Sequence, residues 1–313
     1  MKIGLARDER KLEKRVALRP EELAPIARRH QVLVERGAGL GVDITDEDYA
    51  RAGAEVVRKE KVYACPLVVK LREPNEAELR LMRPGSVVFS MLHLFNRLLL
   101  TKQLRRHRVN GIAMEKIKDR LGERMIEDLH ELGYAGMMKA FELWGGRPER
   151  AVVKIMGSGR IAMGAVQAAS RREARVLLLN RRDINEMEHH LPGTDILVDG
   201  LTWPEELRGK VYIATRSMLK LMNHGAAVIG LVSNPSGKYP VETMHPTSLS
   251  QISYRTAGVL HAACWGWSGL DPINVTRRYS IQIAPVLSDI ASAGGDYHRL
   301  PEYVRAAWFE GVK

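Results

Sequence analysis

A glycine-rich turn at residues 157–162 is the strongest chemical signal in the sequence. Its order is Gly157-Ser158-Gly159-Arg160-Ile161-Ala162. An apolar run at residues 152–155 precedes the turn, an alanine-rich helical segment comes after it, and a second apolar run occupies residues 176–179. In a strand–turn–helix–strand unit of this kind, glycines let backbone N–H groups approach a pyrophosphate at the helix N-terminus. The sequence therefore predicts a dinucleotide-binding turn, with a glycine turn in another type of βα unit as the alternative.

The end of the second apolar run indicates which dinucleotide would bind. An acidic residue there holds the ribose 2′-hydroxyl of NAD, whereas this chain has Asn180, Arg181 and Arg182. Guanidinium groups attract a 2′-phosphate that a carboxylate would repel. We therefore expect NADP(H) in preference to NAD(H), the alternative being a solvated run of charge. Gly200 and Leu201, directly after a third expected strand at 195–199, complete the expected cofactor site.

Three basic residues near the start of the chain, Arg15, Lys70 and His93, could handle an anionic substrate. Lys70 lies in an apolar strand, where an unpaired ammonium group is costly to bury, unless its side chain reaches water at the strand end. His93 comes after an expected strand at 86–90, and its unperturbed pKa near neutrality suits a general acid or base. Taken alone, each residue is also compatible with a purely structural role.

Composition excludes several classes of protein. The chain has 313 residues, of which 45% are hydrophobic and 27% charged, as in globular proteins of about two domains. Its longest apolar stretch, residues 87–100, contains His93, Asn96 and Arg97, so we expect no membrane span. Two cysteines cannot build a disulfide framework or a zinc cluster, so we expect no metal and a reducing cytoplasm.

The formal net charge of +11 raises the question of nucleic-acid binding. The basic residues are spread along the whole chain among acidic ones, and aromatic residues make up only 6%. No basic arm or RNA-binding aromatic strand is present. A preference for a phosphorylated cofactor and carboxylate substrates accounts for the charge, and we expect no nucleic-acid partner.

The order of short strands and helices predicts an α/β fold with two Rossmann-like domains. Residues 1–125 with 272–313 would form the catalytic domain, completed by a C-terminal helix from Pro272. Residues 126–271 would form a dinucleotide-binding domain with a doubly wound parallel sheet, entered by a linking helix at 126–145. Small residues at 133–136 are expected to interrupt that helix where another backbone or the cofactor approaches. A last helix is expected at 301–309.

Several collinear segments resemble the alanine dehydrogenase/pyridine nucleotide transhydrogenase family. They extend over nearly the whole chain, and each resembles a particular family motif. They are residues 14–20 (KRVALRP, like FRVAxTP), 37–46 (like GAGxGxxxxD), 69–74 (VKLREP, like KVKEP), 92–94 (LHL, like LHLA), 215–237 (like TREMVxxMKPGAVIVDVAxDQGG), 245–247 (HPT) and 258–261 (GVLH). Within the family, the chain is most similar to opine-forming members of the N5-(carboxyethyl)ornithine synthase type.

The resemblance assigns roles to the basic residues. It implies that Arg15 binds the substrate carboxylate, that Lys70 binds a carbonyl or carboxylate oxygen, and that His93 is the catalytic acid or base. The family's catalytic aspartate falls on Asn234, which can form hydrogen bonds but cannot transfer a proton. The family's NMPG segment is replaced by residues 266–269 (GWSG), so that Trp265 and Trp267 would line an altered substrate pocket or simply pack.

The sequence thus predicts an NADP(H)-dependent oxidoreductase that reduces the imine of a 2-oxo acid and an amine, as opine synthases do. An NAD-dependent alanine dehydrogenase and a catalytically silent NADP-binding protein are the alternatives, because the loss of the aspartate at Asn234 affects the activation of water and ammonia. The expected partners are amino acids and 2-oxo acids, and the resemblance implies a homo-oligomer.

Overall fold

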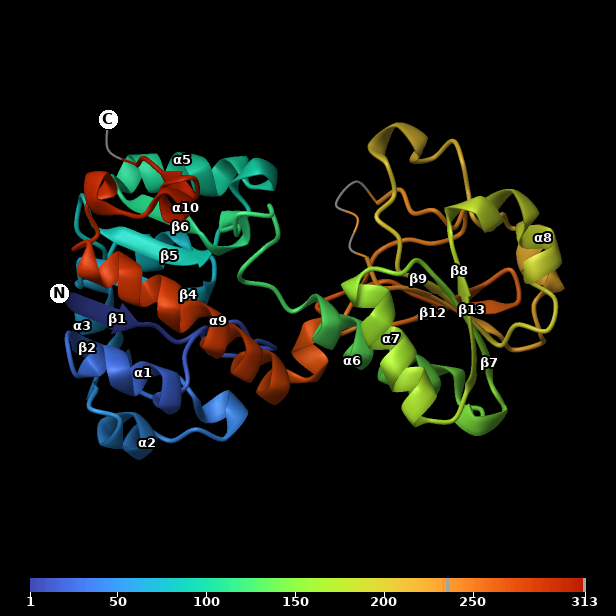
Figure 1. Cartoon of the computed structure of the whole chain (residues 1–313), viewed down its shortest axis with the longest axis horizontal. Coiled ribbons are helices and arrows are strands. Elements are labelled where there is room, and N and C mark those ends of the chain that lie inside the picture. Colours follow the sequence, from blue (N-terminus) through green and yellow to red (C-terminus); the bar gives the residue numbers. More distant parts are fainter. Residues whose placement is uncertain (233, 235–236, 312–313) are drawn as a thin grey trace. The chain divides into compact units, whose positions relative to one another are not determined.

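The computed structural model describes residues 1–232, 234 and 237–311. The chain forms two compact units (Figure 1). Unit 1 consists of Met1–Glu127 and Pro272–Lys313, and unit 2 of Asp128–Asp271. The sequence predicts changes of domain after residues 125 and 271. As expected, each unit is an α/β structure built on a mainly parallel sheet.

Unit 1 contains a seven-stranded sheet in the order β15-β6-β5-β4-β1-β2-β3. All neighbours are parallel except β15, which runs antiparallel to β6. The strands are β1 (Lys2–Leu5), β2 (Gln31–Glu35), β3 (Glu55–Val57), β4 (Leu67–Arg72), β5 (Val87–Met91), β6 (Asn110–Ala113) and β15 (Trp308–Phe309). The first six strands adopt the 3-2-1-4-5-6 order of a doubly wound nucleotide-binding fold.

Helices cover both faces of this sheet. The α-helices of unit 1 are α1 (Pro20–Ala27), α2 (Asp46–Arg51), α3 (Lys59–Tyr63), α4 (Glu76–Leu79), α5 (Leu98–His107), α9 (Pro272–Ser292) and α10 (Glu302–Arg305). Short 3-10 turns are η1 (Leu40–Val42), η2 (Leu94–Asn96), η3 (Met114–Lys116) and η9 (Tyr297–Arg299). Helix α9 returns the chain to unit 1 because its apolar residues recur every three or four positions, as in Val275, Tyr279 and Ile283, and pack into the core.

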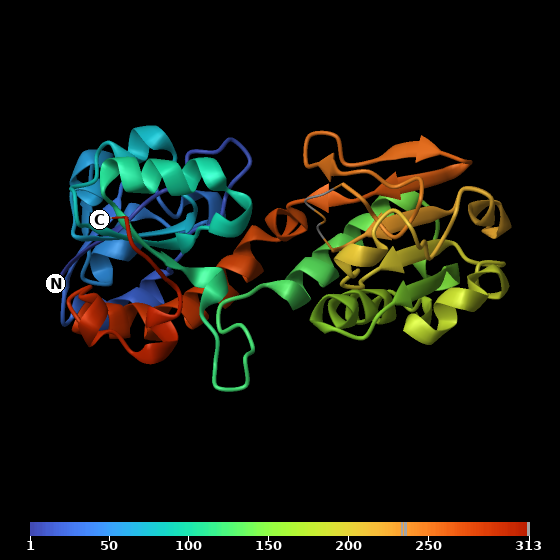
Figure 2. The ribbon, with the colours of Figure 1, turned by 90° about the horizontal axis from the view of Figure 1, so that it is seen from above.

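Unit 2 contains a six-stranded sheet in the order β12-β13-β10-β9-β7-β8. Its strands are β7 (Val152–Met156), β8 (Arg175–Leu179), β9 (Ile196–Asp199), β10 (Ala227–Gly230), β12 (Tyr254–Thr256) and β13 (Val259–Ala262). All neighbours are parallel except β12 and β13. Seen from above, β12 and β13 (orange) form one edge of the sheet and the lime-coloured β8 the other (Figure 2).

Two long helices pack side by side on the sheet of unit 2. They are α6 (Leu129–Trp144) and α7 (Arg160–Arg171). Helix α6 runs without the interruption expected at residues 133–136. The close approach of another backbone that was expected there is present, since a Cβ atom on Gly133 would lie 1.9 Å from the Ile161 carbonyl oxygen, and one on Gly164 would lie 2.0 Å from that of His130.

The rest of unit 2 is made of short elements. They are α8 (Met187–His190), the 3-10 turns η4 (Pro148–Arg150), η5 (Arg181–Glu186), η6 (Glu205–Leu207), η7 (Met218–Leu221) and η8 (Trp267–Leu270), and the parallel pair β11 (Thr247–Ser248) and β14 (Cys264–Trp265).

The last segment of the chain differs from the helix expected at residues 301–309. Helix α10 ends at Arg305, and Trp308–Phe309 forms strand β15, which pairs with β6 through Trp308 and Ile112. The edge of the sheet offers backbone hydrogen bonds that a lone surface helix would not gain. No helix in the described part of the chain is long and apolar enough to cross a membrane, and its His, Cys, Asp and Glu side chains form no group of three suited to a metal ion.

Candidate functional site

The glycine turn of unit 2 joins β7 directly to α7. Gly157 has a φ of +103°, a conformation that side chains other than glycine rarely adopt, and its N–H donates to the Leu179 carbonyl (2.8 Å). A Cβ atom on Gly157 would also lie 3.1 Å from the Gly200 carbonyl oxygen. The first glycine is therefore required both by its backbone conformation and by the close approach of β9.

The structure brings most of the predicted cofactor residues to one edge of the sheet. Parallel strands end side by side, so the turn after β7 lies beside Asn180 after β8 and beside Gly200 and Leu201 after β9. Gly200 N donates to Met156 O at 3.0 Å, which holds the two strand ends together. Ligands of open α/β sheets bind at this carboxyl edge.

The N-terminus of α7 has the properties that a pyrophosphate needs. Its N-cap is Gly159, and no side chain caps the first N–H groups of the helix. Ser158 and Gly159 are exposed, and a Cβ atom on Gly159 would meet nothing within 4 Å. The turn is thus open at Ser158 and Gly159, and the residues present fit a dinucleotide.

The arginines after β8 lie in a capped turn. The Asn180 side chain accepts from Arg182 N (2.8 Å), and Asp183 accepts from Asn180 N (2.7 Å). One nitrogen of the Arg181 guanidinium donates to Thr202 O (3.1 Å), which holds this side chain beside the segment after β9, and Arg182 is exposed. The turn places both guanidinium groups near the end of β8, but it adds a carboxylate, Asp183, which the prediction from sequence did not include.

Unit 1 gathers its charged residues at the carboxyl edge of its own sheet. Arg72 ends β4, His93 comes after β5, and Asp8 lies in the long loop after β1 that also carries Arg15. The side chain of Arg72 donates no hydrogen bond within the described part of the chain. Its one ion pair is distant, with 3.8 Å from Nε to Glu73 Oε2. Burial and the charges of Arg10 and Arg15 lower the pKa of Arg72. An arginine placed among other arginines, with its donors unused, is suited to bind an anion.

Lys70, which the resemblance implies binds a substrate oxygen, is buried in an ion pair in this structure. Its side chain is 3% exposed, and Nζ lies 2.5 Å from Glu78 Oε1 and 3.3 Å from the Tyr63 hydroxyl. Although burial alone would raise it, the charge of Lys70 holds the pKa of Glu78 below its ordinary value. The ammonium group is thus bound within unit 1. Arg72 lies two residues further along β4, past a register shift between β4 and β5, and keeps its side-chain donors available.

Arg15 and the remaining arginines of this edge have carboxylate partners. The guanidinium of Arg15 makes a bidentate pair with Glu13 through Nε (2.7 Å) and Nη2 (2.6 Å). Glu73 pairs with both Arg10 (2.9 Å) and Arg97. Against the effect of burial, the hydrogen bonds and charge of Arg15 lower the pKa of Glu13. A substrate carboxylate that binds Arg15 must therefore either displace Glu13 or bind while the Arg15–Glu13 pair stays in place.

His93 has a strained backbone and a fixed position. Its φ of +47° places it in the left-handed region, which is unfavourable for residues other than glycine. The buried carboxylate of Glu115 accepts from the N–H groups of Leu92 (3.1 Å) and His93 (2.7 Å) and lies 3.9 Å from His93 Nδ1. Burial lowers the pKa of His93, with contributions from Arg124 and Arg72 that oppose Glu115. A neutral imidazole, with 45% of its side chain exposed, is available for proton transfer at pH 7.

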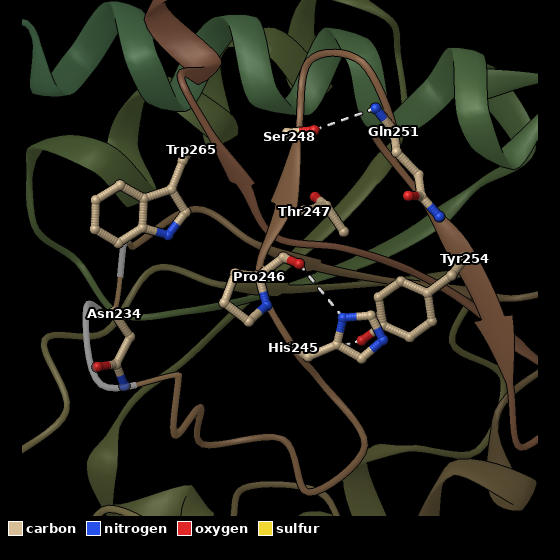
Figure 3. Close-up of a pocket in the computed structure, with 8 residues that line it drawn as sticks. All are labelled: Asn234, His245, Pro246, Thr247, Ser248, Gln251, Tyr254 and Trp265. Carbon is tan, nitrogen blue, oxygen red and sulfur yellow. Dashed lines mark hydrogen bonds between the residues drawn. The ribbon is translucent and has the colours of Figure 1, made fainter.

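A pocket of about 410 Å³ lies within unit 2 (Figure 3). One side carries Asn234 and Trp265, and the other carries His245 and Tyr254, whose rings stack at 3.7 Å. Tyr254 OH accepts from His245 N (2.8 Å) and donates to Thr243 O (3.0 Å), and burial raises its pKa to about 12. The lining combines polar and apolar surface and includes no Asp, Glu, Lys or Arg side chain, so the pocket suits a neutral group with both polar and apolar parts.

Asn234 and Trp267 have clear positions. Asn234 comes after β10 at the carboxyl edge, is 5% exposed, and donates through Nδ2 to the Lys238 carbonyl. Trp267 is 1% exposed, belongs to the core, and donates through Nε1 to Gly230 O at 2.9 Å. Of the two tryptophans considered for a pocket, Trp267 therefore packs in the interior and does not line the pocket in Figure 3. Trp265, 46% exposed, is the one that lines the pocket.

Two residues in the sites were missed in the prediction from sequence. Arg72 lies within the segment 69–74 that resembles a family motif, but the prediction gave it no role. Asp199, the last residue of β9, is 1% exposed, and its Oδ1 accepts from Leu201 N at 3.1 Å. Burial raises the pKa of Asp199 to about 7. No feature of the sequence distinguishes this aspartate from an exposed one at a strand end.

Two family models match the chain. The N-terminal domain of alanine dehydrogenase/PNT matches residues 4–129, and the C-terminal domain matches residues 179–305. Among curated proteins, the chain is similar to alanine dehydrogenase of Staphylococcus saprophyticus (27% identical, 94% of this chain and 88% of the relative). Alanine dehydrogenase of Methanococcus maripaludis is 28% identical over the same shares.

Solved structures show the same fold. An L-alanine dehydrogenase superposes with a TM-score of 0.85 at 24% identity and covers 99% of this chain and 96% of its own. A transhydrogenase from Sinorhizobium meliloti superposes with a TM-score of 0.81 at 20% identity, covering 93% and 94%. The expectation of two Rossmann-like domains is confirmed.

Proposed function

Because the chain belongs to the alanine dehydrogenase/PNT family, we propose that it is a pyridine-nucleotide-dependent amino-acid dehydrogenase. The reaction would interconvert a 2-amino acid with a 2-oxo acid at the C–N bond. The names of the relatives support amination by ammonia, as in alanine dehydrogenases, over the opine-forming reaction that the sequence favoured. Asn234 remains the feature that argues in the other direction.

The observation that carries the proposal is the set of donors at the carboxyl edge of unit 1. Arg72 has an unused guanidinium beside Arg15, and its charge acts on the pKa of the neighbouring His93. An anion anchor next to a neutral imidazole is the minimum that a 2-oxo acid needs. The anchor holds the carboxylate, and the imidazole exchanges a proton with the adjoining oxygen or nitrogen.

The chain's own groups support a division of labour between the units. In unit 1, Arg72 and Arg15 would bind the carboxylate, His93 would move the proton, and Lys70 would hold Glu78 and the local charge in place. In unit 2, the α7 N-terminus and Gly159 would hold the pyrophosphate of the dinucleotide. When bound, the nicotinamide ring supplies or accepts the hydride. Asn234 would orient a polar ligand by hydrogen bonding, without transferring a proton.

The test is oxidation of NADPH or NADH, monitored by absorbance, with pyruvate and other 2-oxo acids in the presence of ammonia or of amino acids. We expect ammonia-dependent turnover, and we expect Arg72→Met to lower kcat/KM about 100-fold or more, as for loss of a charged hydrogen bond to the substrate. Arg80→Met is the matched control, since Arg80 is exposed and pairs only with Glu76. Equal activity of the Arg72→Met variant and wild type would refute the role of this edge.

Cofactor binding is tested separately by titration of the protein with NADPH and NADH. Gly159→Ala should abolish binding and leave the fold intact, because the added methyl group meets no protein atom but lies where the pyrophosphate would approach. Replacing Arg181 and Arg182 by serine should weaken NADPH binding and spare NADH binding. Tight binding of NADPH with no turnover in any amine combination would select the catalytically silent alternative, which the loss of the aspartate at Asn234 favours.

A further inference from the structure

Strand β8 forms an uncovered edge of the unit 2 sheet. Its only partner in the described part of the chain is β7. The backbone groups of Arg175 and Leu179 point toward β7, because Arg175 N donates to Ala151 O (2.9 Å) and Leu179 O accepts from Gly157 N (2.8 Å). By alternation along the parallel pair of β7 and β8, the N–H and C=O groups of Val176 and Leu178 point away from β7.

The side chains of β8 are those of an interior strand. Val176, Leu177 and Leu178 are apolar, yet Leu178 is 48% exposed and the other two are partly exposed. The corresponding strand of unit 1, β2, is covered on its outer side by β3, and its Val32, Leu33 and Val34 are at most 3% exposed. An exposed apolar edge strand is a ready template for pairing with another strand.

The topology explains why this edge is uncovered. In the doubly wound order 3-2-1-4-5-6, the third strand covers the second, as β3 covers β2 in unit 1. In unit 2 the segment after β8 forms η5 and α8 and then enters β9 on the far side of β7. No strand of unit 2 is left to take the third position, since every described strand of that unit already has its place in a sheet.

We propose that β8 is a self-association surface, on which β8 of a second copy of this chain pairs antiparallel about a two-fold axis at Leu177. In this register Val176 of one copy faces Leu178 of the other. The backbone N–H and C=O groups of both residues point away from β7, so Val176 of one copy and Leu178 of the other exchange two N–H···O=C hydrogen bonds. The edge is therefore complementary to itself, as a two-fold interface requires.

The charges flanking the strand are compatible with this register. Arg175 of one copy faces Leu179 of the other and not a second arginine. Beyond the strand ends, Arg171 and Glu173 come opposite Asp183 and Arg181 respectively, whereas Arg172 and Arg182 face each other and must turn outward. Of these six charged residues beyond the strand ends, Asp183 is partly buried and the other five are exposed in the single chain. A single pair of five-residue strands buries less than a standard interface, so we expect association that depends on protein concentration.

A cysteine cross-link tests the register directly. Leu177 would face its own counterpart in a non-hydrogen-bonded pair with Cα atoms about 4.5 Å apart, within the range of a disulfide. The variant Leu177→Cys should therefore form a covalent dimer under mild oxidation, seen on a non-reducing gel. Leu178→Cys is the matched control, because its two copies would be about 8–9 Å apart, beyond the reach of a disulfide. The native Cys65 and Cys264 are buried and should not contribute.

A second measurement keeps the test independent of cysteine chemistry. Sedimentation velocity over a range of about 1–100 μM should show that Leu178→Lys weakens self-association at least tenfold. Leu221→Lys, at a similarly exposed leucine of unit 2 (43%), should leave it unchanged. Absence of the Leu177→Cys dimer, equal cross-linking of both cysteine variants, or association unaffected by Leu178→Lys would overturn the proposal. If β8 instead pairs with an extended segment of a different protein, the Leu177→Cys dimer should be absent.

Discussion

The two units share a strand order but differ in the segments after their first and second strands. After β1, unit 1 has a long charged loop with Asp8, Glu13 and Arg15, whereas after β7 unit 2 has a short glycine turn. After β2, unit 1 adds β3, and after β8 unit 2 adds no strand. Two sheets with the same topology thus present different groups. Unit 1 presents charged side chains that could bind a substrate, and unit 2 presents backbone N–H donors. Chemistry is determined here by the loops at the carboxyl edge, and the sheet only aligns them.

The two units also differ in how they bury charge. Unit 1 buries Lys70 and Glu78 as a pair, while unit 2 buries Asp199 without a cationic partner within hydrogen-bonding distance. A paired charge keeps its ionised form in the interior, but a lone carboxyl group retains its proton to higher pH. Substitutions in each unit can test these differences, and their expected effects range from several kcal/mol to a few tenths.

Breaking the pair in unit 1 should have the largest effect. Glu78→Ala leaves the Lys70 ammonium buried without its nearest carboxylate, with only Asp8 at 4.0 Å, and should lower the free energy of unfolding of unit 1 by about 3–5 kcal/mol. Replacing both residues, as in Lys70→Met with Glu78→Leu, should restore most of this loss. Amide hydrogen exchange of peptides from β4 measures the change within unit 1. A loss below about 1 kcal/mol for Glu78→Ala would mean that the pair is effectively solvated.

Close packing of α6 on α7 in unit 2 should be sensitive to one methyl group. Gly133→Ala places a Cβ atom 1.9 Å from the Ile161 carbonyl oxygen and should destabilise unit 2 by about 2–3 kcal/mol. Gly159→Ala, which meets no atom within 4 Å, is the control and should change stability by less than about 1 kcal/mol. Urea unfolding measures both variants. Similar losses for the two would show that the α6–α7 spacing is adjustable.

Asp199 should give unit 2 a pH dependence. Its pKa in the folded state is about 7, above the value near 3.9 of an unfolded aspartate, so the folded state binds more protons between these values. Stability should therefore fall as pH rises from 5 to 7, by about 1 kcal/mol per pH unit, and Asp199→Asn should remove this slope. Unfolding of wild type and variant at several pH values measures it. Parallel curves for the two proteins would show that Asp199 is ionised throughout.

The covered and uncovered second strands should respond differently to truncation. Leu178→Ala in β8 should change the stability of dilute protein by no more than about 0.5 kcal/mol, because nearly half of the side chain is already in water. Leu33→Ala in β2, at 1% exposure, should cost several times more and serves as the comparison. Urea unfolding at low protein concentration separates the two. Equal losses would mean that another part of the molecule shields β8.

Sequence alone determined the features that depend on local order. The glycine turn needs only an apolar run, two glycines and a helical segment in succession. The return helix after Pro272 likewise depends on adjacent residues. The two Rossmann-like domains were predictable because alternating strands and helices admit few topologies.

Only the tertiary structure decided which charged groups remain available. Lys70 and Arg72 lie two residues apart on one strand. Their side chains differ in availability because Glu78, from another element, pairs with Lys70 and does not pair with Arg72. Trp265 and Trp267 likewise look equivalent in sequence, yet one lines the pocket and the other fills the core. The missing neighbour of β8 and the burial of Asp199 are also long-range properties. Such properties depend on contacts between distant segments, which local sequence patterns do not encode.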